Sequence, residues 1–374
     1  MILYPYSGYV GVLWLLARFK PRQSHVSVSL PKHKVTLFIS AYNEEATIER
    51  KIRNSLALDY PKDCLEIVVV SDGSTDKTCE VVSKYASRGI TIRNYEGRIG
   101  KTACLNRAVL LAEGEIIVFS DANALYPPNT VHELIRHFDD PKVGFVTGST
   151  RYVTSIENDR ESVAESMSLY AKVQHLIKDL ESSVGSCIGA DGAIFAIRKK
   201  YYEELDHVDI NDLVLPLKIL KRGAVGKLAS GAVCIEEAFG SPQAQFRRQV
   251  RIANRTIRAL MKNIDLVNPV KFGLIAFQLL SGKVLKMLCP IAMAVLLISN
   301  LWLLSQHWFY VLTFVGQLTV YSTAWLSNKG IRPWGLSRVL SVAHTFMLVN
   351  LAISLGWLQY LKGETYTTWA PVRR

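Results

Sequence analysis

Residues 65–78 read LEIVVVSDGSTDKT, a short run of mostly β-branched apolar residues that ends in an acidic, glycine-containing turn. A run of this kind, without polar alternation, is typical of a strand buried on both faces of a parallel sheet. In parallel sheets, ligands bind at the carboxyl ends of the strands, so the polar residues after the run are candidate site residues. Asp72 and Asp76 stand at this position.

The same pattern recurs before and after this stretch. Residues 35–40 (VTLFIS) precede the polar turn AYNEEAT, residues 90–94 form a short apolar run, and residues 115–120 (EIIVFS) precede SDAN. Between the runs, apolar residues follow helical spacing in residues 48–61, 79–86 and 102–112. This alternation predicts an α/β domain with a mostly parallel sheet flanked by helices.

Acidic or amide side chains follow three of the predicted strands. Taken singly, such residues are usually helix caps or turn formers, and Asp76 is best interpreted in this way. Together, oxygen ligands at one edge of a sheet suit a hard divalent cation and a phosphate ester. The sequence has no GxxxxGK[ST] loop and no GxGxxG after a strand, so P-loop and dinucleotide sites are not expected.

The last quarter of the chain differs in composition from the middle. With 49% hydrophobic residues and a net charge of +12, the chain is not expected to be disordered, collagen-like or a small disulfide scaffold. Three nearly uncharged runs, residues 285–304, 307–326 and 337–361, predict membrane helices. Buried helices of a soluble core are the alternative interpretation.

Residues 1–20 predict a further membrane helix, either spanning the bilayer or lying in its interface. Lys20, Arg22, Lys32 and Lys34 follow it, so the positive-inside rule places the middle of the chain in the cytoplasm. Residues 268–287 combine apolar residues with three lysines, which favours a helix in the membrane interface. The side of the membrane on which the C-terminal tail lies is left open.

The motifs together carry a resemblance. In chain order they are ISAYNEE, VVVSDGSTDKT, GKTACLNRAV, FSDAN, GADGAIFAIR and DINDLVLPLKILKRG. Their order and spacing over about residues 35–260 resemble the inverting family-2 glycosyltransferases of GT-A fold. The apolar segments that follow resemble the membrane-anchored subgroup that makes polysaccharides or glycolipids. The resemblance implies a GT-A domain over residues 33–262, with interfacial and transmembrane helices over residues 266–374.

The resemblance implies a donor site for a nucleotide sugar. Asn43, Glu45 and Asp72 would contact the base and ribose, and Lys101 would lie near the nucleotide, unless it is a solvated loop lysine. Asp121 matches the first carboxylate of the family's Asp-x-Asp element and would hold Mg²⁺ or Mn²⁺ against the diphosphate.

The second metal position of that element is altered in this sequence. Asn123 stands where the family carries an aspartate, so the site has one negative charge fewer. We expect the metal to bind more weakly before the nucleotide arrives.

Asp212 matches the aspartate that the family uses as general base. An inverting transfer needs a base to accept the proton of the acceptor hydroxyl while its oxygen attacks the sugar. Asp209, three residues earlier, is the alternative base, and an N-cap role is the structural alternative for Asp212.

The resemblance also implies an acceptor side. Gly192 would let a sugar or lipid headgroup approach the backbone, and Asp191 would bond to hydroxyl groups or merely form a turn. Arg248 and Arg251 would neutralise the diphosphate, or would belong to a basic helix that faces anionic lipid. Processive relatives carry Gln-x-x-Arg-Trp here, and this chain has Ile252 in place of the tryptophan, which favours addition of one or a few sugars.

These expectations describe a multi-pass protein of the plasma or inner membrane with its transferase domain in the cytoplasm. It would transfer a sugar from a nucleotide sugar, most simply a UDP-sugar, to a membrane-associated lipid or glycan with inversion. A processive synthase that exports its polymer is the first alternative, and a non-catalytic membrane scaffold or transporter is the second. Nucleic-acid binding is not expected, because the basic residues lack interleaved stacking aromatics.

Overall fold

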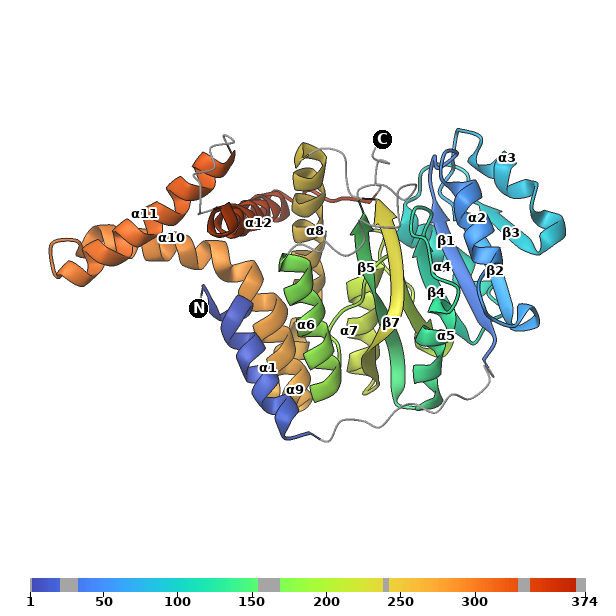
Figure 1. The fold of residues 1–374 in the computed structure, drawn as a ribbon, viewed down its shortest axis with the longest axis horizontal. Coiled ribbons are helices and arrows are strands. Elements are labelled where there is room, and N and C mark those ends of the chain that lie inside the picture. Colours follow the sequence, from blue (N-terminus) through green and yellow to red (C-terminus); the bar gives the residue numbers. More distant parts are fainter. Residues whose placement is uncertain (1, 21–32, 154–168, 238–241, 329–336, 368–374) are drawn as a thin grey trace. The chain divides into compact units, whose positions relative to one another are not determined.

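The structure is a computed structural model of the 374-residue chain, and it describes residues 2–20, 33–153, 169–237, 242–328 and 337–367 (Figure 1). By internal packing the chain forms two compact units. The larger unit comprises residues 10–240, 262–279 and 366–374, and the smaller unit comprises residues 1–9, 241–261 and 280–365. Lys20, Arg248 and Arg251 are among the described residues, whereas Arg22 and Lys32 lie outside them.

The larger unit is built on a seven-stranded sheet with the order β3-β2-β1-β4-β6-β5-β7. Four of its neighbouring pairs are parallel and two, both involving β6, are antiparallel. This confirms the mostly parallel sheet. The strands are β1 (Val35–Ala41), β2 (Leu65–Ser71), β3 (Ile90–Asn94), β4 (Ile116–Asp121), β5 (Val143–Val153), β6 (Ile194–Arg198) and β7 (Val225–Glu237).

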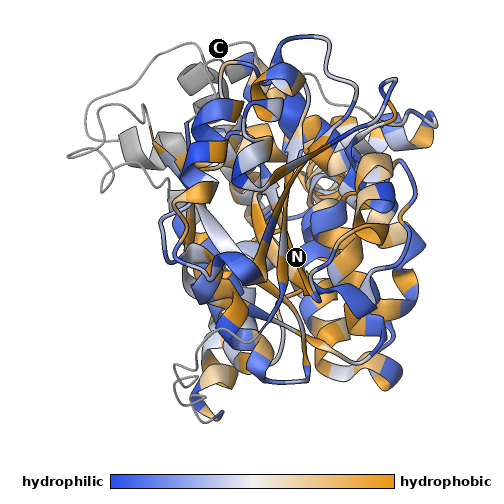
Figure 2. Cartoon of the chain, turned by 90° about the vertical axis from the view of Figure 1, so that its right-hand side faces the viewer, coloured by the Kyte–Doolittle hydropathy of each residue, from blue (hydrophilic) through white to orange (hydrophobic). Residues whose placement is uncertain are grey.

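Both faces of the sheet are covered, as the continuous apolar runs predict. Successive residues of a strand point to opposite faces. Leu37 of β1 belongs to a buried cluster with Ile48 and Ile52 of α2, whereas Phe38 lies beside Phe119 on the other face, with ring centroids 6.3 Å apart. In Figure 2, several central strands are coloured as hydrophobic along most of their length.

Short helices alternate with the strands. The helices of the larger unit include α2 (Ile48–Leu56), α3 (Thr78–Ser83), α4 (Lys101–Leu110), α5 (Thr130–Ile135), α6 (Leu169–Val184), α7 (Asn211–Lys221) and α9 (Pro269–Leu279). The sequence predicts α2, α3 and α4 with their ends displaced by a few residues. The helix α1 (Tyr9–Arg18) begins in the smaller unit and ends in the larger one.

The register brings the site-bearing residues to one edge. Ala41 of β1 lies opposite Ser71 of β2, and Ser40 lies opposite Asp121 of β4. The strand β6 runs the other way, with Ile194 opposite Ser120, so the turn before β6 lies at the same edge. The residues that follow β1, β2 and β4 therefore meet the residues that precede β6.

The smaller unit consists of long helices: α8 (Pro242–Lys262, without its last residue), α10 (Leu285–Leu303), α11 (Trp308–Asn328) and α12 (Ser337–Leu361). Within the described residues, two stretches are long and apolar enough to cross a membrane, Pro269–Leu303 and Val342–Leu361. In an apolar 18-residue window of each stretch, 17% and 22% of the window is buried.

The number of candidate spans differs from the sequence expectation. The run at residues 307–326 is helical, as α11, and is not one of the two candidate spans found in the described residues, so its role as a membrane helix stays a prediction. The ten-residue α1 is not one of these candidate spans either. The stretch expected in the interface, residues 268–287, leads into α10 through a π-helical segment, Leu280–Val284. Within α9, in the same stretch, Gly273 takes a positive φ of 49°.

Candidate active site

The loops after β1 and β2 are joined to each other by side chains. The Asn43 side chain accepts a hydrogen bond from the backbone N–H of Thr75 at 2.8 Å, and Asn43 itself has a positive φ of 51°. The Glu45 carboxylate accepts one from the Lys77 N–H at 3.1 Å, and the Glu45 N–H donates to Asp76 at 3.0 Å. In this structure Asn43 and Glu45 hold the two loops together, and their contact with a nucleotide stays a prediction.

Asp72 is buried at the end of β2, with 1% of its surface exposed. Its Oδ1 accepts a hydrogen bond from the Gly100 N–H at 2.8 Å and lies 3.4 Å from the Cys104 thiol. Burial, and then the neighbouring Asp72, raise the pKa of that thiol, so Cys104 is neutral. The Oδ2 atom has no hydrogen-bond partner among the described residues. A buried oxygen left in this state is an acceptor to which a ligand could donate.

Asp121 ends β4 and forms an ion pair with Lys101, with Asp121 Oδ1 and Lys101 Nζ 2.5 Å apart. The Asp121 side chain is 37% exposed, so it remains accessible to a ligand. Asn123 lies two residues further and is half-buried. Within the described parts of the chain, no group of three or more His, Cys, Asp or Glu side chains could hold a metal ion. Asp121 and Asn123 alone would leave most ligands of an ion to be supplied by the diphosphate and water.

A buried lysine lies beneath the segment that follows Asp121. Lys51 of α2 has no exposed surface, and its Nζ donates to the Ala124 carbonyl at 2.5 Å and lies 3.9 Å from the centre of the Tyr126 ring. Burial lowers its pKa to about 7, although Cys234, Asp121 and Glu236 act in the opposite direction. Sequence reasoning missed Lys51, which in the stretch IERKIRN resembles a solvated helix residue.

Asp212 lies in the first turn of α7, against Gly192. A Cβ atom at residue 192 would come within 2.8 Å of Asp212 Oδ2, so only glycine leaves the carboxylate where it is. The Asp212 carbonyl also accepts a hydrogen bond from the Ala190 N–H at 2.8 Å. The structure thus brings together the predicted base and the predicted acceptor-side glycine, which lie 20 residues apart in the chain.

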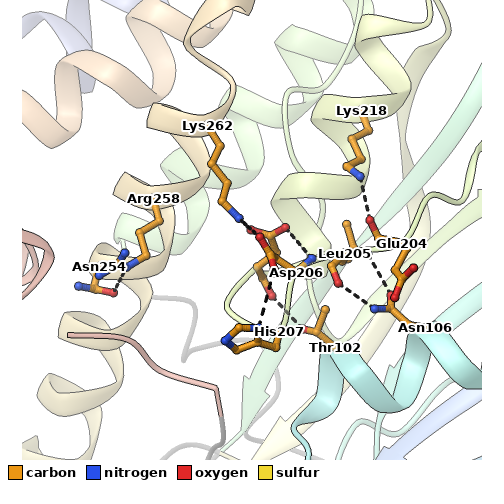
Figure 3. Close-up of polar contacts among 11 residues, drawn as sticks. Thr102, Asn106, Glu204, Leu205, Asp206, His207, Lys218, Asn254, Arg258 and Lys262 are labelled. Atoms are coloured by element: carbon orange, nitrogen blue, oxygen red, sulfur yellow. Dashed lines mark hydrogen bonds and ion pairs between the residues drawn. The ribbon is translucent and has the colours of Figure 1, made fainter. Parts of the chain in front are cut away.

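Asp209, the alternative base, is part of an ion-pair cluster with Lys262 and Asp206, the two members that Figure 3 labels. It is 6% exposed, and its Oδ1 lies 3.1 Å from the Nζ of Lys262, which also contacts Asp206 at 2.6 Å. The Asp209 Oδ2 accepts the Asp206 N–H at 3.0 Å. Partial burial lowers the pKa of Lys262, but hydrogen bonds to Asp206 and Asp209 outweigh it and raise that pKa overall. Such pairing ties Asp209 to the fold, and the assignment of the base to Asp212 stays a prediction.

Asp191 has its hydrogen bonds completed within the sheet. Its two oxygens accept from the Thr150 N–H at 3.0 Å and the Thr150 hydroxyl at 2.9 Å, and its own N–H donates to Thr147 at 2.8 Å. The contact with acceptor hydroxyls stays a prediction, and the observed bonds give Asp191 a structural role in joining β5 to β6.

Arg248 and Arg251 lie on α8 in the smaller unit, so their contact with a diphosphate also stays a prediction. Farther along this helix, the Arg258 guanidinium donates to the Glu364 carbonyl at 2.6 Å and lies 5.0 Å from the centre of the Tyr360 ring. Arg258 therefore joins α8 to the end of α12, within the smaller unit.

Comparison with known proteins gives a family and a fold. Residues 36–206 match the sequence model of glycosyl transferase family 2. A poly-beta-1,6-N-acetyl-D-glucosamine synthase of Staphylococcus aureus is 27% identical over 240 residues, which cover 61% of this chain and 56% of that protein. A beta-monoglucosyldiacylglycerol synthase of Nostoc sp. is 31% identical over 153 residues, which cover 40% of this chain and 32% of that protein. The chain thus matches little more than half the length of the first relative and a third of the second.

Among solved structures, a mannosyltransferase from Pyrobaculum calidifontis, in complex with GDP-Man and Mn²⁺, has a TM-score of 0.70. It is 22% identical in sequence, and the superposition covers 96% of each chain. At this identity the similarity establishes the fold, which is the GT-A-like fold that the motifs implied. The chain therefore carries a glycosyl transferase family 2 domain, and residues 36–206 are its matched extent.

Proposed function

We propose that this chain is a membrane-associated, inverting glycosyltransferase that moves a sugar from a nucleoside diphosphate sugar to a lipid or glycan acceptor. The observation that carries the proposal is the gathering of Asp72, Asp121 and Asp212 at one edge of a family 2 domain. Asp72 and Asp121 lie at the ends of parallel strands, and Asp212 lies against the turn that precedes β6.

The donor nucleotide would lie over the loops after β1, β2 and β4. The buried, unpartnered Oδ2 of Asp72 suits a donor group of the base or ribose. We expect UDP as the nucleotide, and the mannosyltransferase of similar fold, solved with GDP-Man, makes GDP the first competitor in a test.

Asp121 and Asn123 would hold a Mg²⁺ or Mn²⁺ ion. Their oxygen atoms fit a hard cation, and the exposed Asp121 carboxylate is accessible to one. When bound, the ion would supply positive charge to stabilise the departing diphosphate. Lys101, which now neutralises Asp121, would be repelled by the ion and left available to bind a phosphate oxygen.

Asp212 would accept the proton of the acceptor hydroxyl as that oxygen attacks the anomeric carbon. Gly192 leaves room for this carboxylate, since a Cβ atom at residue 192 would come within 2.8 Å of Asp212 Oδ2. The two candidate spans support an acceptor held in or at the membrane. The cytoplasmic side is proposed for the transferase domain from the basic residues Lys20, Arg22, Lys32 and Lys34 that follow the first helix. The relatives' names include both a polysaccharide and a glycolipid synthase, so a processive reaction is the competing outcome.

Donor binding is tested first by thermal unfolding of the detergent-solubilised chain with UDP, GDP, CDP or dTDP, each with and without Mn²⁺. A ligand that binds the folded state raises the unfolding midpoint. We expect one nucleotide to do so only with metal, and Asp121→Ala to abolish that shift. Asp63→Asn is the control. Asp63 is exposed and lies before β2, at the edge of the sheet opposite to the site. A metal-independent shift would contradict the role of Asp121.

The base is tested with Asp212→Asn. We expect this variant to bind the nucleotide as the wild type does and to lose transfer by about 10²–10⁴-fold. The assay measures release of nucleoside diphosphate from UDP-N-acetylglucosamine, UDP-glucose and GDP-mannose in membrane vesicles, with product length analysed by mass. An active Asp212→Asn enzyme would contradict the base assignment, and long products would favour the processive synthase.

A further inference from the structure

The first turns of α4 contact the donor side and the base side of the site at once. On the donor side, the Gly100 N–H donates to Asp72 Oδ1 at 2.8 Å, and Lys101 Nζ lies 2.5 Å from Asp121 Oδ1. Gly100 has a φ of 92°, a conformation that favours glycine and directs its N–H into this contact. Two of the three carboxylates of the proposed mechanism are thus bonded to the start of one helix.

Thr102, the residue after Lys101, contacts the loop that leads into the proposed base Asp212. The Thr102 hydroxyl donates to the Asp209 carbonyl at 2.8 Å, and Thr102 is only 3% exposed (Figure 3). Asp209 lies three residues before Asp212, directly ahead of α7. The backbone that leads into the proposed base is therefore bonded to the residue beside Lys101.

One turn further along α4, Asn106 contacts the other end of the same loop. Its Nδ2 donates to the Leu205 carbonyl at 2.8 Å, and its Oδ1 accepts from the Leu205 N–H at 3.1 Å and the Tyr202 hydroxyl at 2.8 Å. Lys218 of α7 donates to the Glu204 carbonyl at 2.9 Å. Residues 202–209 are thus fixed by α4 and, through Lys262, by the ion pairs to Asp206 and Asp209.

We propose that Thr102 and Asn106 are positioning residues, which set the loop before Asp212 from the same helix that contacts Asp72 and Asp121. The proposal rests on the proposed function, because it assumes that Asp212 is the base. The Gly100 contact with Asp72 would hold α4 beside the donor, whether or not a metal ion displaces Lys101 from Asp121. The helix α4 would in turn hold the loop that leads into Asp212, so one helix would set the base relative to the donor. Misplacing a reacting group by about 1 Å costs on the order of 10²-fold in rate.

The test compares Thr102→Val, which keeps the shape but removes the hydroxyl, with Thr102→Ser, which restores it. Thr130→Val is the matched control. Thr130, in α5, is also buried, and its hydroxyl donates to the Val233 carbonyl at 3.2 Å. For each variant we would measure the dissociation constant of UDP with Mn²⁺, the kcat for the donor found active above, and the thermal midpoint. Thr102→Ala replaces Thr102→Val if the valine variant does not fold.

We expect Thr102→Val to lower kcat about tenfold, since its base is misplaced by less than 1 Å, and to leave UDP affinity unchanged. Thr102→Ser should recover the wild-type kcat, and Thr130→Val should keep it even if its midpoint falls equally. A kcat that falls in step with the midpoint in both valine variants would overturn the proposal. If Thr102→Val is fully active while Asp212→Asn is inactive, only this inference fails. If Asp212→Asn is active, the base assignment fails first.

Discussion

Asp72 and Asp191 occupy comparable places in the two halves of the sheet, and their hydrogen bonding differs. Asp72 follows β2 and keeps one buried oxygen without a partner among the described residues, whereas both oxygens of Asp191 accept bonds from Thr150. Asp72 is 1% exposed whereas Asp191 is half-buried, so the unpartnered oxygen of Asp72 is the costlier one and the stronger candidate for a ligand contact. Position at the strand edge is therefore not sufficient to identify a ligand contact.

The largest effect that would test this comparison is on nucleotide affinity. Asp72→Asn replaces one acceptor by an NH₂ group, so either Gly100 or the ligand loses its partner. Losing a hydrogen bond to a charged group costs about 1.5–3 kcal/mol, so we expect binding of UDP with Mn²⁺ to weaken roughly 10- to 100-fold. Titration calorimetry measures it, and wild-type affinity in Asp72→Asn would break the comparison.

The matching change in the other half should act on stability instead. Asp191→Asn leaves the Thr150 N–H or hydroxyl with a poorer acceptor, which we expect to cost about 1–2 kcal/mol of folding free energy. The midpoint of thermal unfolding should fall while UDP affinity stays at the wild-type value. If Asp191→Asn instead weakens nucleotide or acceptor binding and leaves the midpoint of thermal unfolding unchanged, Asp191 contacts a ligand.

Lys51 allows the half of the sheet that carries Asp72 and Asp121 to be tested by pH, because burial lowers the pKa of this lysine to about 7. Above pH 7 the folded chain has released the Lys51 proton that the unfolded chain still binds up to its ordinary pKa of 10.5. The free energy of unfolding should therefore rise with pH in this window, by about 1.4 kcal/mol per pH unit from this group.

Lys51→Met removes that contribution and leaves the other titrating groups in place. Between pH 7.5 and 9.5, the thermal midpoint of the wild type should therefore rise relative to that of Lys51→Met, whichever protein is the more stable at pH 7.5. Parallel curves would mean that Lys51 keeps an ordinary pKa when it is buried.

The smallest effect concerns the contact between Gly192 and Asp212. An added methyl group at residue 192 would meet Asp212 Oδ2 at 2.8 Å and displace it by a few tenths of an ångström. We expect Gly192→Ala to lower kcat about three- to tenfold with UDP affinity unchanged, because the base moves by less than 1 Å. The measurement is the same diphosphate-release assay. Gly11→Ala, in α1, is the control, because its Cβ would meet nothing within 4 Å and its φ, like that of Gly192, is not positive.

The sequence predicts the parallel part of the fold closely, because its signal is local. The strand at residues 90–94 has the expected bounds, and the strand before SDAN begins one residue later than expected. The reversed direction of β6 could not be read from GADGAIFAIR, since a buried run is apolar in either direction.

Site residues can be predicted from the sequence when their residue type and motif indicate the chemistry. They cannot be predicted when their role depends on a contact with a distant part of the chain. Asp121 and Asp212 stand in recognisable motifs. Thr102 and Lys51 stand in helices whose sequences resemble ordinary amphipathic helices, and their roles depend on a carbonyl that is distant in the chain. A single sequence contains no signal for such pairs.

The connectivity of the sheet also sets an order of assembly. The strands β1 to β4, together with Asp72 and Asp121, lie within one contiguous stretch, residues 35–121. The strand β5 pairs with β7, which the ribosome delivers only after α7. Both halves contain one distant pairing of similar span, since Val35 pairs with Ile116 and Val143 pairs with Val225. The order therefore follows synthesis: the N-terminal half of the sheet can form with its two carboxylates before the strand that β5 needs has been made.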